Sequence, residues 1–293
     1  MKQTLAKNSS TMNTSYFRKK KIDLGILYVV LFLLALYTLA PLWILFVNSF
    51  KGQDEIIANP LALPTTLSMQ YILNAISEIH FFKAVGTTTL ITASSVLLIV
   101  LVSSLAAWMM VRNKGKASNL VFMCFVAAML IPFQAIMYPL IQFFDDLGLK
   151  NAIGLVFMYG GFGLSMSVFL YHGFVKGVPK GVEEAATIDG CNIFQMYGLV
   201  VMPLLKSITV TVVVLNSMWI WNDYLLPFLV IGNSNTKTLV LELYFAKITS
   251  GQYGNPWQLI FPAVFISIIP IVIVYLFLQK FIVKGISDGA IKS

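Results

Sequence analysis

The sequence has few charged residues for its length. Of its 293 residues, 11% are Asp, Glu, Lys or Arg, and 58% are hydrophobic. A soluble globular domain has about a quarter charged and roughly half apolar residues. So few charged groups cannot cover a water-facing surface of this size, which indicates that much of the surface faces lipid.

Groups that carry chemistry are also scarce. The two cysteines, Cys124 and Cys191, fit no metal-binding or redox spacing and are interpreted as free thiols. No Ser-His-Asp set, metal cluster or pair of carboxylates converges in a way that suggests catalysis. The pattern G-x-x-x-x-G-K-[ST] of nucleotide-binding loops is missing as well. The sequence therefore predicts a chain that is not an enzyme, binds no metal or cofactor, and does not itself hold ATP.

Long apolar runs are what the sequence has instead. Each run reaches the roughly 20 residues that cross a bilayer as a helix, and the first is too long for a secretory signal. Because the runs do not alternate in polarity, an all-α fold with transmembrane helices is predicted rather than a barrel. A polar and basic tail over 1–21, expected to be flexible, precedes a membrane domain over 22–293. The predicted spans are 25–47, 85–111, 120–144, 153–175, 208–231 and 259–281.

The positive charge predicts an orientation. A net charge of +8 would suggest nucleic acid as the partner of a soluble protein. Here the basic residues cluster at the ends of the apolar runs, as the positive-inside rule describes, so no nucleic-acid partner is expected. If the N-terminus lies inside, the outer segments keep only Lys51, Lys83, Lys150, Lys237 and Lys247. A multi-pass membrane protein with both termini in the cytoplasm is predicted.

The segment 176–206, predicted to be cytoplasmic, combines carboxylates with small residues. Pro179 suits the first turn of a helix. Glu183 and Glu184 follow where negative charge meets the positive end of the helix dipole. Gly190 interrupts the pattern, and a second helical period leads to Pro203. Two short helices with a bend near Gly190 are therefore expected.

Two interpretations of this bend are open. The small residues Ala185 and Ala186, flanked by carboxylates such as Asp189, would let another protein approach closely and pair its basic side chains. The alternative is an amphipathic helix that lies along the lipid headgroups. Such helices usually carry Lys and Arg on their polar face, so the acidic residues favour protein docking.

Residues 184–203 follow the pattern E-A-A-x3-G-x9-V-x-M-P. It is similar to the EAA motif of ABC importer permeases, E-A-A-x3-G-x9-I-x-L-P, with mild departures at Val200 and Met202. The stretches "PLIQFFDDLGLKNAIGLVFMY", "WNDYLLPFLV" and "KGISDGAIKS" resemble further regions of this family. The resemblance runs from about Gly25 to the C-terminus. It is closest to the maltose-type permeases of carbohydrate importers, specifically the shorter partner with six helices.

The resemblance implies a type I ABC importer permease fold and a division of labour in a bacterial cell membrane. A second, homologous permease subunit would complete the translocation path, and an extracytoplasmic binding protein would deliver the sugar. Two ATPase subunits would hold ATP and Mg. The segment 176–206 would be a coupling helix seated in a cleft on an ATPase subunit. The residues assigned to coupling are Glu183, Glu184, Ala185, Ala186, Asp189, Gly190 and Pro203.

Polar residues in the predicted fifth span are candidates for the sugar path. By helical spacing one face could hold Asn216, Trp219, Asn222 and Asp223. An aromatic ring against a sugar face, with amide and carboxylate groups on its hydroxyls, would suit a saccharide. The alternative, that Asn222 and Asp223 cap or pair with a neighbouring helix, is left open.

Competing functions are weaker. An ion-coupled secondary transporter needs buried ionisable groups near the middle of the membrane. Asp223 is the sole candidate, and the sequence shows no break in its span. No residue or motif in the sequence favours a membrane scaffold or a membrane enzyme. The sequence thus predicts an ATP-driven importer subunit for a sugar, with an oligosaccharide as the expected substrate.

Overall fold

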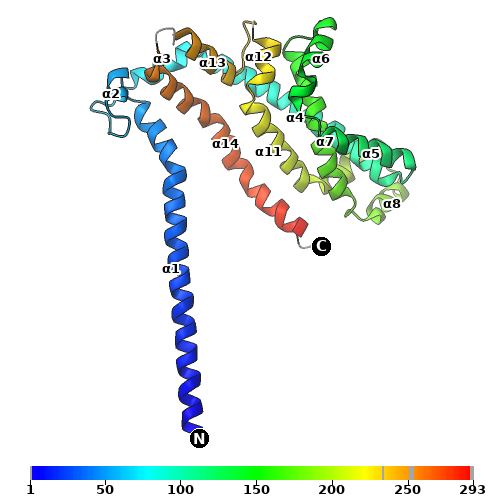
Figure 1. Ribbon diagram of the computed structural model, residues 1–293. Helices are drawn as coiled ribbons and strands as arrows, with labels where there is room; N and C mark the ends of the chain where they lie inside the picture. Colours follow the sequence, from blue (N-terminus) through cyan, green and yellow to red (C-terminus); the bar gives the residue numbers. More distant parts are fainter. Residues whose placement is uncertain (1, 233, 251–253, 291–293) are drawn as a thin grey trace. The chain divides into compact units, whose positions relative to one another are not determined.

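The computed structural model describes residues 2–232, 234–250 and 254–290, and side chains over 24–232, 234–248 and 254–277. The described residues form helices and no strand, so the predicted all-α class is confirmed. Lys292, predicted to lie inside, falls outside the described residues. Two compact units are present, one of residues 1–72 and 257–265 and the other of residues 73–256 and 266–293 (Figure 1).

The first unit contains the first predicted span. Its helices are α1 (Lys2–Asn48), α2 (Gln53–Ala58) and the beginnings of α3 (Gln70–Glu78) and α14 (Trp257–Ala290). The part of α1 from Leu24 to Asn48 is long and apolar enough to cross a membrane. Residues 2–21, for which the sequence predicted a flexible tail, are helical and continue into the span. These residues include no Gly or Pro that would interrupt a helix.

A buried polar cluster follows the end of α1. The side-chain amide of Asn48 donates to the carbonyl oxygens of Ile44 at 2.7 Å and Pro60 at 2.8 Å. Lys51 is fully buried, and its Nζ donates to the carbonyl oxygen of Asn59 at 3.1 Å. These bonds attach the segment after α2 to the end of the span, because buried polar groups must find partners.

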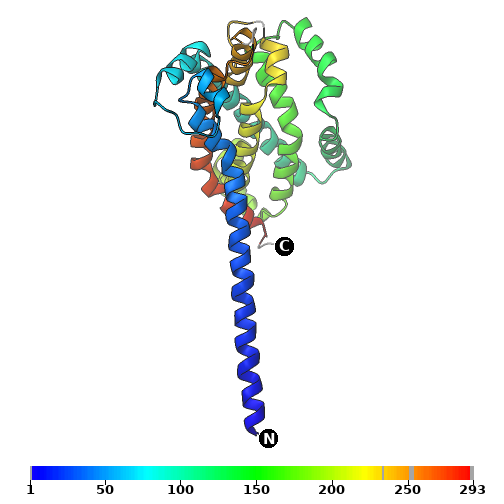
Figure 2. The same cartoon turned by 60° about the vertical axis from the view of Figure 1, so that its left-hand side comes forward.

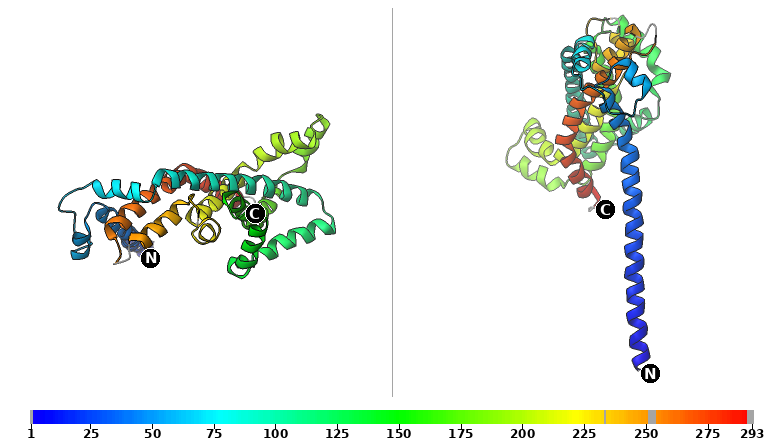
Figure 3. Two further views of the ribbon diagram at one scale, coloured as in Figure 1. Left: turned by 90° about the horizontal axis from the view of Figure 1, so that it is seen from above. Right: turned by 90° about the vertical axis from the view of Figure 1, so that its left-hand side faces the viewer.

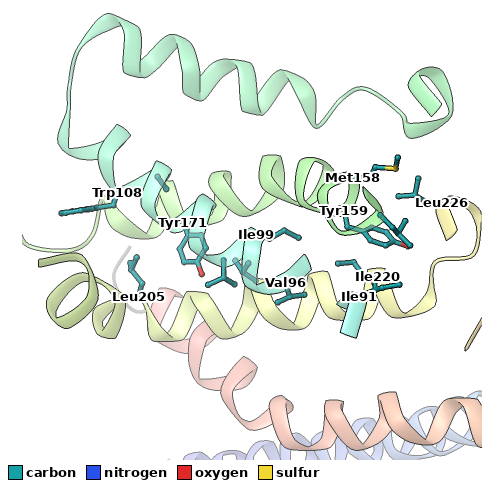
Figure 4. Close-up of a cluster of buried hydrophobic side chains, with 14 of the residues drawn as sticks. Ile91, Val96, Ile99, Trp108, Met158, Tyr159, Tyr171, Leu205, Ile220 and Leu226 are labelled. Atoms are coloured by element: carbon teal, nitrogen blue, oxygen red, sulfur yellow. The ribbon is translucent and has the colours of Figure 1, made fainter. Parts of the chain in front are cut away.

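The second unit is built on two long helices that pack against each other, α4 and α7. Its helices are α4 (Phe81–Arg112), α5 (Lys116–Ala128), α6 (Phe133–Asp146), α7 (Ala152–Val175), α8 (Lys180–Ile188), α9 (Ile193–Gln195), α10 (Met202–Leu204), α11 (Lys206–Asn222), α12 (Leu225–Ile231), α13 (Leu239–Ser250) and the rest of α14. A π-helix (Met196–Val201) lies between α9 and α10. The buried core includes residues from α4, α7 and α11 such as Ile99, Tyr159 and Ile220 (Figure 4).

Small residues allow the close approach of these helices. A Cβ added at Gly163 would clash with Cδ1 of Ile99 on α4 and would lie 2.7 Å from Oδ1 of Asn216 on α11. A Cβ at Gly160 would lie 2.7 Å from a methyl carbon of Leu98. In lipid, where apolar burial gives little drive for helix association, such packing and interhelical hydrogen bonds hold helices together.

Two predicted spans are broken helices. Within the described residues, four helices are long and apolar enough to cross a membrane. Up to six spans result if each of two bent pairs counts as one, namely 116–128 with 133–146 and 193–204 with 206–222. The predicted third span, 120–144, is formed by α5 and α6, which meet at 105° (Figure 2). The break precedes Pro132, whose ring disfavours a helical conformation at the residue before it. The predicted fifth span, 208–231, was expected to be continuous, but α11 ends at Asn222 and α12 begins at Leu225.

Candidate functional site

The predicted bend lies at the end of α8, where Gly190 adopts a left-handed backbone conformation with φ +85°. Its N–H donates to the carbonyl oxygen of Thr187 at 3.1 Å. The N–H of Cys191 donates to the carbonyl oxygen of Ala186 at 3.0 Å. This pair of bonds is a Schellman motif, which requires a residue that tolerates positive φ after the helix end. Glycine is therefore needed for its backbone freedom, because a Cβ at this position would meet no atom within 4 Å.

The second half of the bend is held by a capping box. Oδ1 of Asn192 accepts hydrogen bonds from the N–H groups of Phe194 at 3.0 Å and Gln195 at 2.9 Å. Oε1 of Gln195 accepts one from the N–H of Asn192 at 2.9 Å. Both helix ends beside the bend are thus satisfied locally, so the turn has a defined shape. Seen from above, the yellow-green segment that holds α8 to α10 projects from α4 and α7 (Figure 3).

An ion pair attaches α8 to the end of α4. The guanidinium of Arg112 donates to Glu183 through Nη2 at 2.6 Å and through Nε at 2.9 and 3.1 Å. Nε1 of Trp108 donates to the same carboxylate at 3.1 Å. The two charged side chains are only 16% and 13% exposed. Glu183, which the sequence assigned to the docking face, thus has Arg112 and Trp108 of its own chain as hydrogen-bond partners.

A second contact attaches the π-helix to the same face of α4. The hydroxyl of Tyr197 lies 2.7 Å from Oγ of Ser104, and its ring stacks on Trp108 with centroids 5.9 Å apart. Ser104, Trp108 and Arg112 are spaced four residues apart, so they share one face of the helix. This row was not predicted from the sequence, although its four-residue spacing and its residue types were visible there.

The outer surface of the bend has exposed apolar side chains beside its carboxylates. Ile188 is 86% exposed and Phe194 is 84% exposed. Glu184 and Asp189 are exposed as well. We call Ile188 and Phe194 the apolar tip. The prediction that Ala185 and Ala186 form one smooth outer face was wrong for Ala186, which is 8% exposed and belongs to the core cluster.

The polar residues of α11 separate into two groups. Asn216 and Trp219 line a cavity of about 600 Å³ between α11, α7 and the α5–α6 pair. Asn216 is buried and donates to Oγ of Ser167 at 3.1 Å, whereas Trp219 is 43% exposed. Asn222 is exposed, and its amide donates to the carbonyl oxygen of Met218 in its own helix at 2.7 Å. Asn222 does not line this cavity.

Asp223 belongs to a different arrangement. Its Oδ2 accepts a hydrogen bond from the hydroxyl of Tyr159 at 2.8 Å, and its Oδ1 accepts one from the N–H of Leu225 at 3.1 Å. The carboxylate thus holds the start of α12 and pairs with α7. Of the two interpretations left open for Asp223, the structure supports capping and pairing, and this bonding explains the break in the predicted fifth span.

Comparison with known proteins decides the family. Residues 99–288 match the family described as "Binding-protein-dependent transport system inner membrane component". The chain belongs to this family. It is therefore a multi-pass membrane protein, a permease subunit of the ABC importer class. Family membership gives no support to the alternative of an ion-coupled secondary transporter.

Individual relatives cover nearly the whole permease. It is 41% identical over 275 residues to the probable starch degradation products transport system permease protein AmyC of Thermoanaerobacterium thermosulfurigenes, covering 94% of this chain and 99% of the relative. It is 33% identical to the multiple sugar-binding transport system permease protein MsmG of Streptococcus mutans, covering 94% and 99%.

A solved structure shares the permease fold. It is the crystal structure of a bacterial ABC transporter involved in the import of the acidic polysaccharide alginate. One of its chains matches with a TM-score of 0.76 and 21% sequence identity, over 90% of this chain and 97% of that one. At this identity the likeness shows the fold alone, and it confirms the predicted type I importer permease architecture.

Proposed function

We propose that this permease forms, with a second permease subunit, the membrane path for a sugar, and that its segment 176–206 couples the path to ATP hydrolysis on separate ATPase subunits. An oligosaccharide is the proposed substrate, supported by the relatives named for starch degradation products, for multiple sugars, and for melibiose, raffinose and stachyose. An extracytoplasmic binding protein would deliver it. ATP and Mg would be held by the ATPase subunits, and both termini would lie in the cytoplasm.

The single observation that carries the coupling role is the apolar tip on a well-anchored bend. Two large apolar side chains that are more than four-fifths exposed are expected to bind another surface. The bend beneath them is held by a Schellman motif, a capping box and an ion pair with α4. A rigid attachment lets a displacement of the tip move α4, which a flexible loop would absorb.

Photo-crosslinking tests which surface the tip touches. A photoreactive phenylalanine analogue replaces Phe194 in the complete importer, and a control carries it at Leu61, in the segment after α2. We expect ATPase peptides in the adducts from position 194 and none from position 61. Lipid adducts alone at position 194 would instead support a helix lying on the headgroups and would contradict coupling.

Gly190→Ala is expected to weaken coupling. An L-residue with a side chain in the left-handed conformation costs about 1–2 kcal/mol, which changes the population of the native turn by roughly 5–30-fold. Sugar uptake per ATP hydrolysed should fall in reconstituted vesicles. Gly190→Asn should be milder, because Asn tolerates this conformation.

Gly181→Ala on the same α8 helix is the matched control. A Cβ at Gly181 meets no atom within 4 Å, and its φ is not positive. Uptake per ATP should therefore remain at the level of the unmodified protein. Equal uptake by the Gly190→Ala and Gly181→Ala variants would contradict a role for the turn.

Trp219→Ala tests the sugar path. Trp219 presents a partly exposed ring to the cavity of about 600 Å³, and its edge-to-face contact with Tyr159 orients it at a centroid distance of 5.4 Å. Loss of one stacked ring, worth about 0.5–1.5 kcal/mol, should lower the uptake rate roughly 2–10-fold with saturating binding protein. Asn222→Ala should leave the rate unchanged. Equal uptake rates in the two variants would show that the cavity is not part of the sugar path.

A further inference from the structure

A second cavity, of about 710 Å³, lies beside the start of α8. It is bounded by the end of α4, the start of α5, the end of α7 and the start of α8. In the orientation proposed above, it opens at the cytoplasmic surface of the membrane. Its lining includes the first residues of the coupling segment 176–206 and none of the residues of the proposed sugar path.

Positive charge dominates this cavity. Arg112, Lys114, Lys176 and Lys180 line it, and no Asp or Glu is among the lining residues. Glu183 neutralises Arg112 alone. Within the described part of the chain, none of the three lysines forms an ion pair. Three like charges around one cavity repel one another, and a bound anion would relieve this repulsion.

Two helices begin at the same cavity. α5 follows Gly115 and α8 follows Pro179, and neither of these residues offers a side chain that caps the helix. The first N–H groups of a helix have no partner within it, and the helix dipole adds partial positive charge there. Two uncapped helix starts and three ammonium groups thus converge on one space, which favours an anion with several oxygen acceptors, such as a phosphate.

The surface of α5 next to the cavity is apolar and exposed. Along α5 no described side chain is buried, and next to the cavity Leu120 and Met123 are 66% and 52% exposed. Acyl chains could lie on this surface while the attached phosphate enters the cavity. Basic pockets between transmembrane helices at the cytoplasmic side are known to suit anionic lipid headgroups.

We propose that this cavity, between the ends of α4 and α7 and the starts of α5 and α8, binds the phosphate of an anionic phospholipid. A free phosphate ester would share the headgroup's chemistry but would make no contact with the exposed face of α5. Occupancy would link the start of the coupling segment to the membrane surface through Lys180 and Lys176.

The test uses the complete importer in nanodiscs of phosphatidylcholine with or without phosphatidylglycerol. The variant combines Lys114→Gln, Lys176→Gln and Lys180→Gln. A control with the same change in charge combines Lys150→Gln, Lys237→Gln and Lys247→Gln, at positions predicted on the opposite side. Native mass spectrometry after gentle extraction counts retained phosphatidylglycerol, and titration calorimetry in phosphatidylcholine nanodiscs measures binding of inorganic phosphate.

Retention of phosphatidylglycerol should fall about tenfold or more in the cavity variant and stay unchanged in the control, because only the cavity variant loses the three positive charges beside the bound phosphate. The unmodified importer should bind no inorganic phosphate at millimolar concentration. Equal retention in the two variants would overturn the proposal. Phosphate binding that depends on the three lysines, without lipid retention, would overturn the lipid as its source. Because neither readout requires ATP or sugar, failure here is distinguishable from failure of the coupling role.

Discussion

Replacing both Ile188 and Phe194 by Asp is expected to release the ATPase subunits from the importer. Burial of two large apolar side chains contributes about 1.5–3 kcal/mol each to an interface, so their loss should weaken association by roughly 100-fold or more. The new carboxylates would add a desolvation cost. Both residues are more than four-fifths exposed, so the fold of the permease itself should be preserved. Affinity purification through this chain, followed by quantitation of the ATPase, measures the effect.

The matched control for this prediction replaces Leu61 and Leu63 by Asp. These two side chains are also well exposed, at 65% and 67%, and they follow α2 in the segment predicted to lie outside. The same ATPase should then co-purify in the normal amount. If the double variant at the apolar tip retained the ATPase as the control does, the tip would have no part in docking.

Glu183→Ala is expected to detach α8 from α4 and to uncouple transport. Removing one partner from a mostly buried ion pair typically costs about 3–5 kcal/mol, because the other charge remains without a counter-charge. Here the charge left behind is Arg112, which is 16% exposed. Thermal stability of the permease should fall, and ATP hydrolysis should continue with little sugar uptake.

Two further variants separate the ion pair from a general effect of charge. Glu184→Ala removes an exposed neighbouring carboxylate and should change the stability by less than about 0.5 kcal/mol. Combining Arg112→Leu with Glu183→Leu replaces the pair by apolar contacts, which should recover part of the lost stability. Melting temperatures in detergent and sugar uptake per ATP hydrolysed are measured for the two variants. Similar results for Glu183→Ala and Glu184→Ala would contradict the anchoring role.

The long apolar runs made the helical class and the approximate positions of the spans predictable. Hydrophobicity over about 20 residues is a local signal that lipid imposes strongly. Breaks in helices were harder to predict. A proline such as Pro132 is a local signal for a break. The end of α11 at Asn222 instead depends on a hydrogen bond between Asp223 and Tyr159, which is 64 residues away in sequence.

For the candidate coupling residues too, the sequence predicts the local backbone features but not the contacts between helices. The need for Gly190 follows from local backbone geometry, and a glycine after a helical run indicates such an end. The sequence also indicated carboxylates at the start of α8. It could not show that Glu183 faces Arg112 while Glu184 faces solvent, because adjacent helical residues point in different directions and the partner lies on another helix.

By itself, the sequence determined that this chain is an all-α membrane protein with a glycine-containing bend in a segment rich in small and acidic residues. Composition and local periodicity suffice for those features. Only the tertiary structure decided which side chains at the bend are tied to α4, which form the apolar tip, and which lysines surround the cavity beside α8. These assignments depend on contacts between helices far apart in sequence, and such contacts arise when packing brings particular helix faces together.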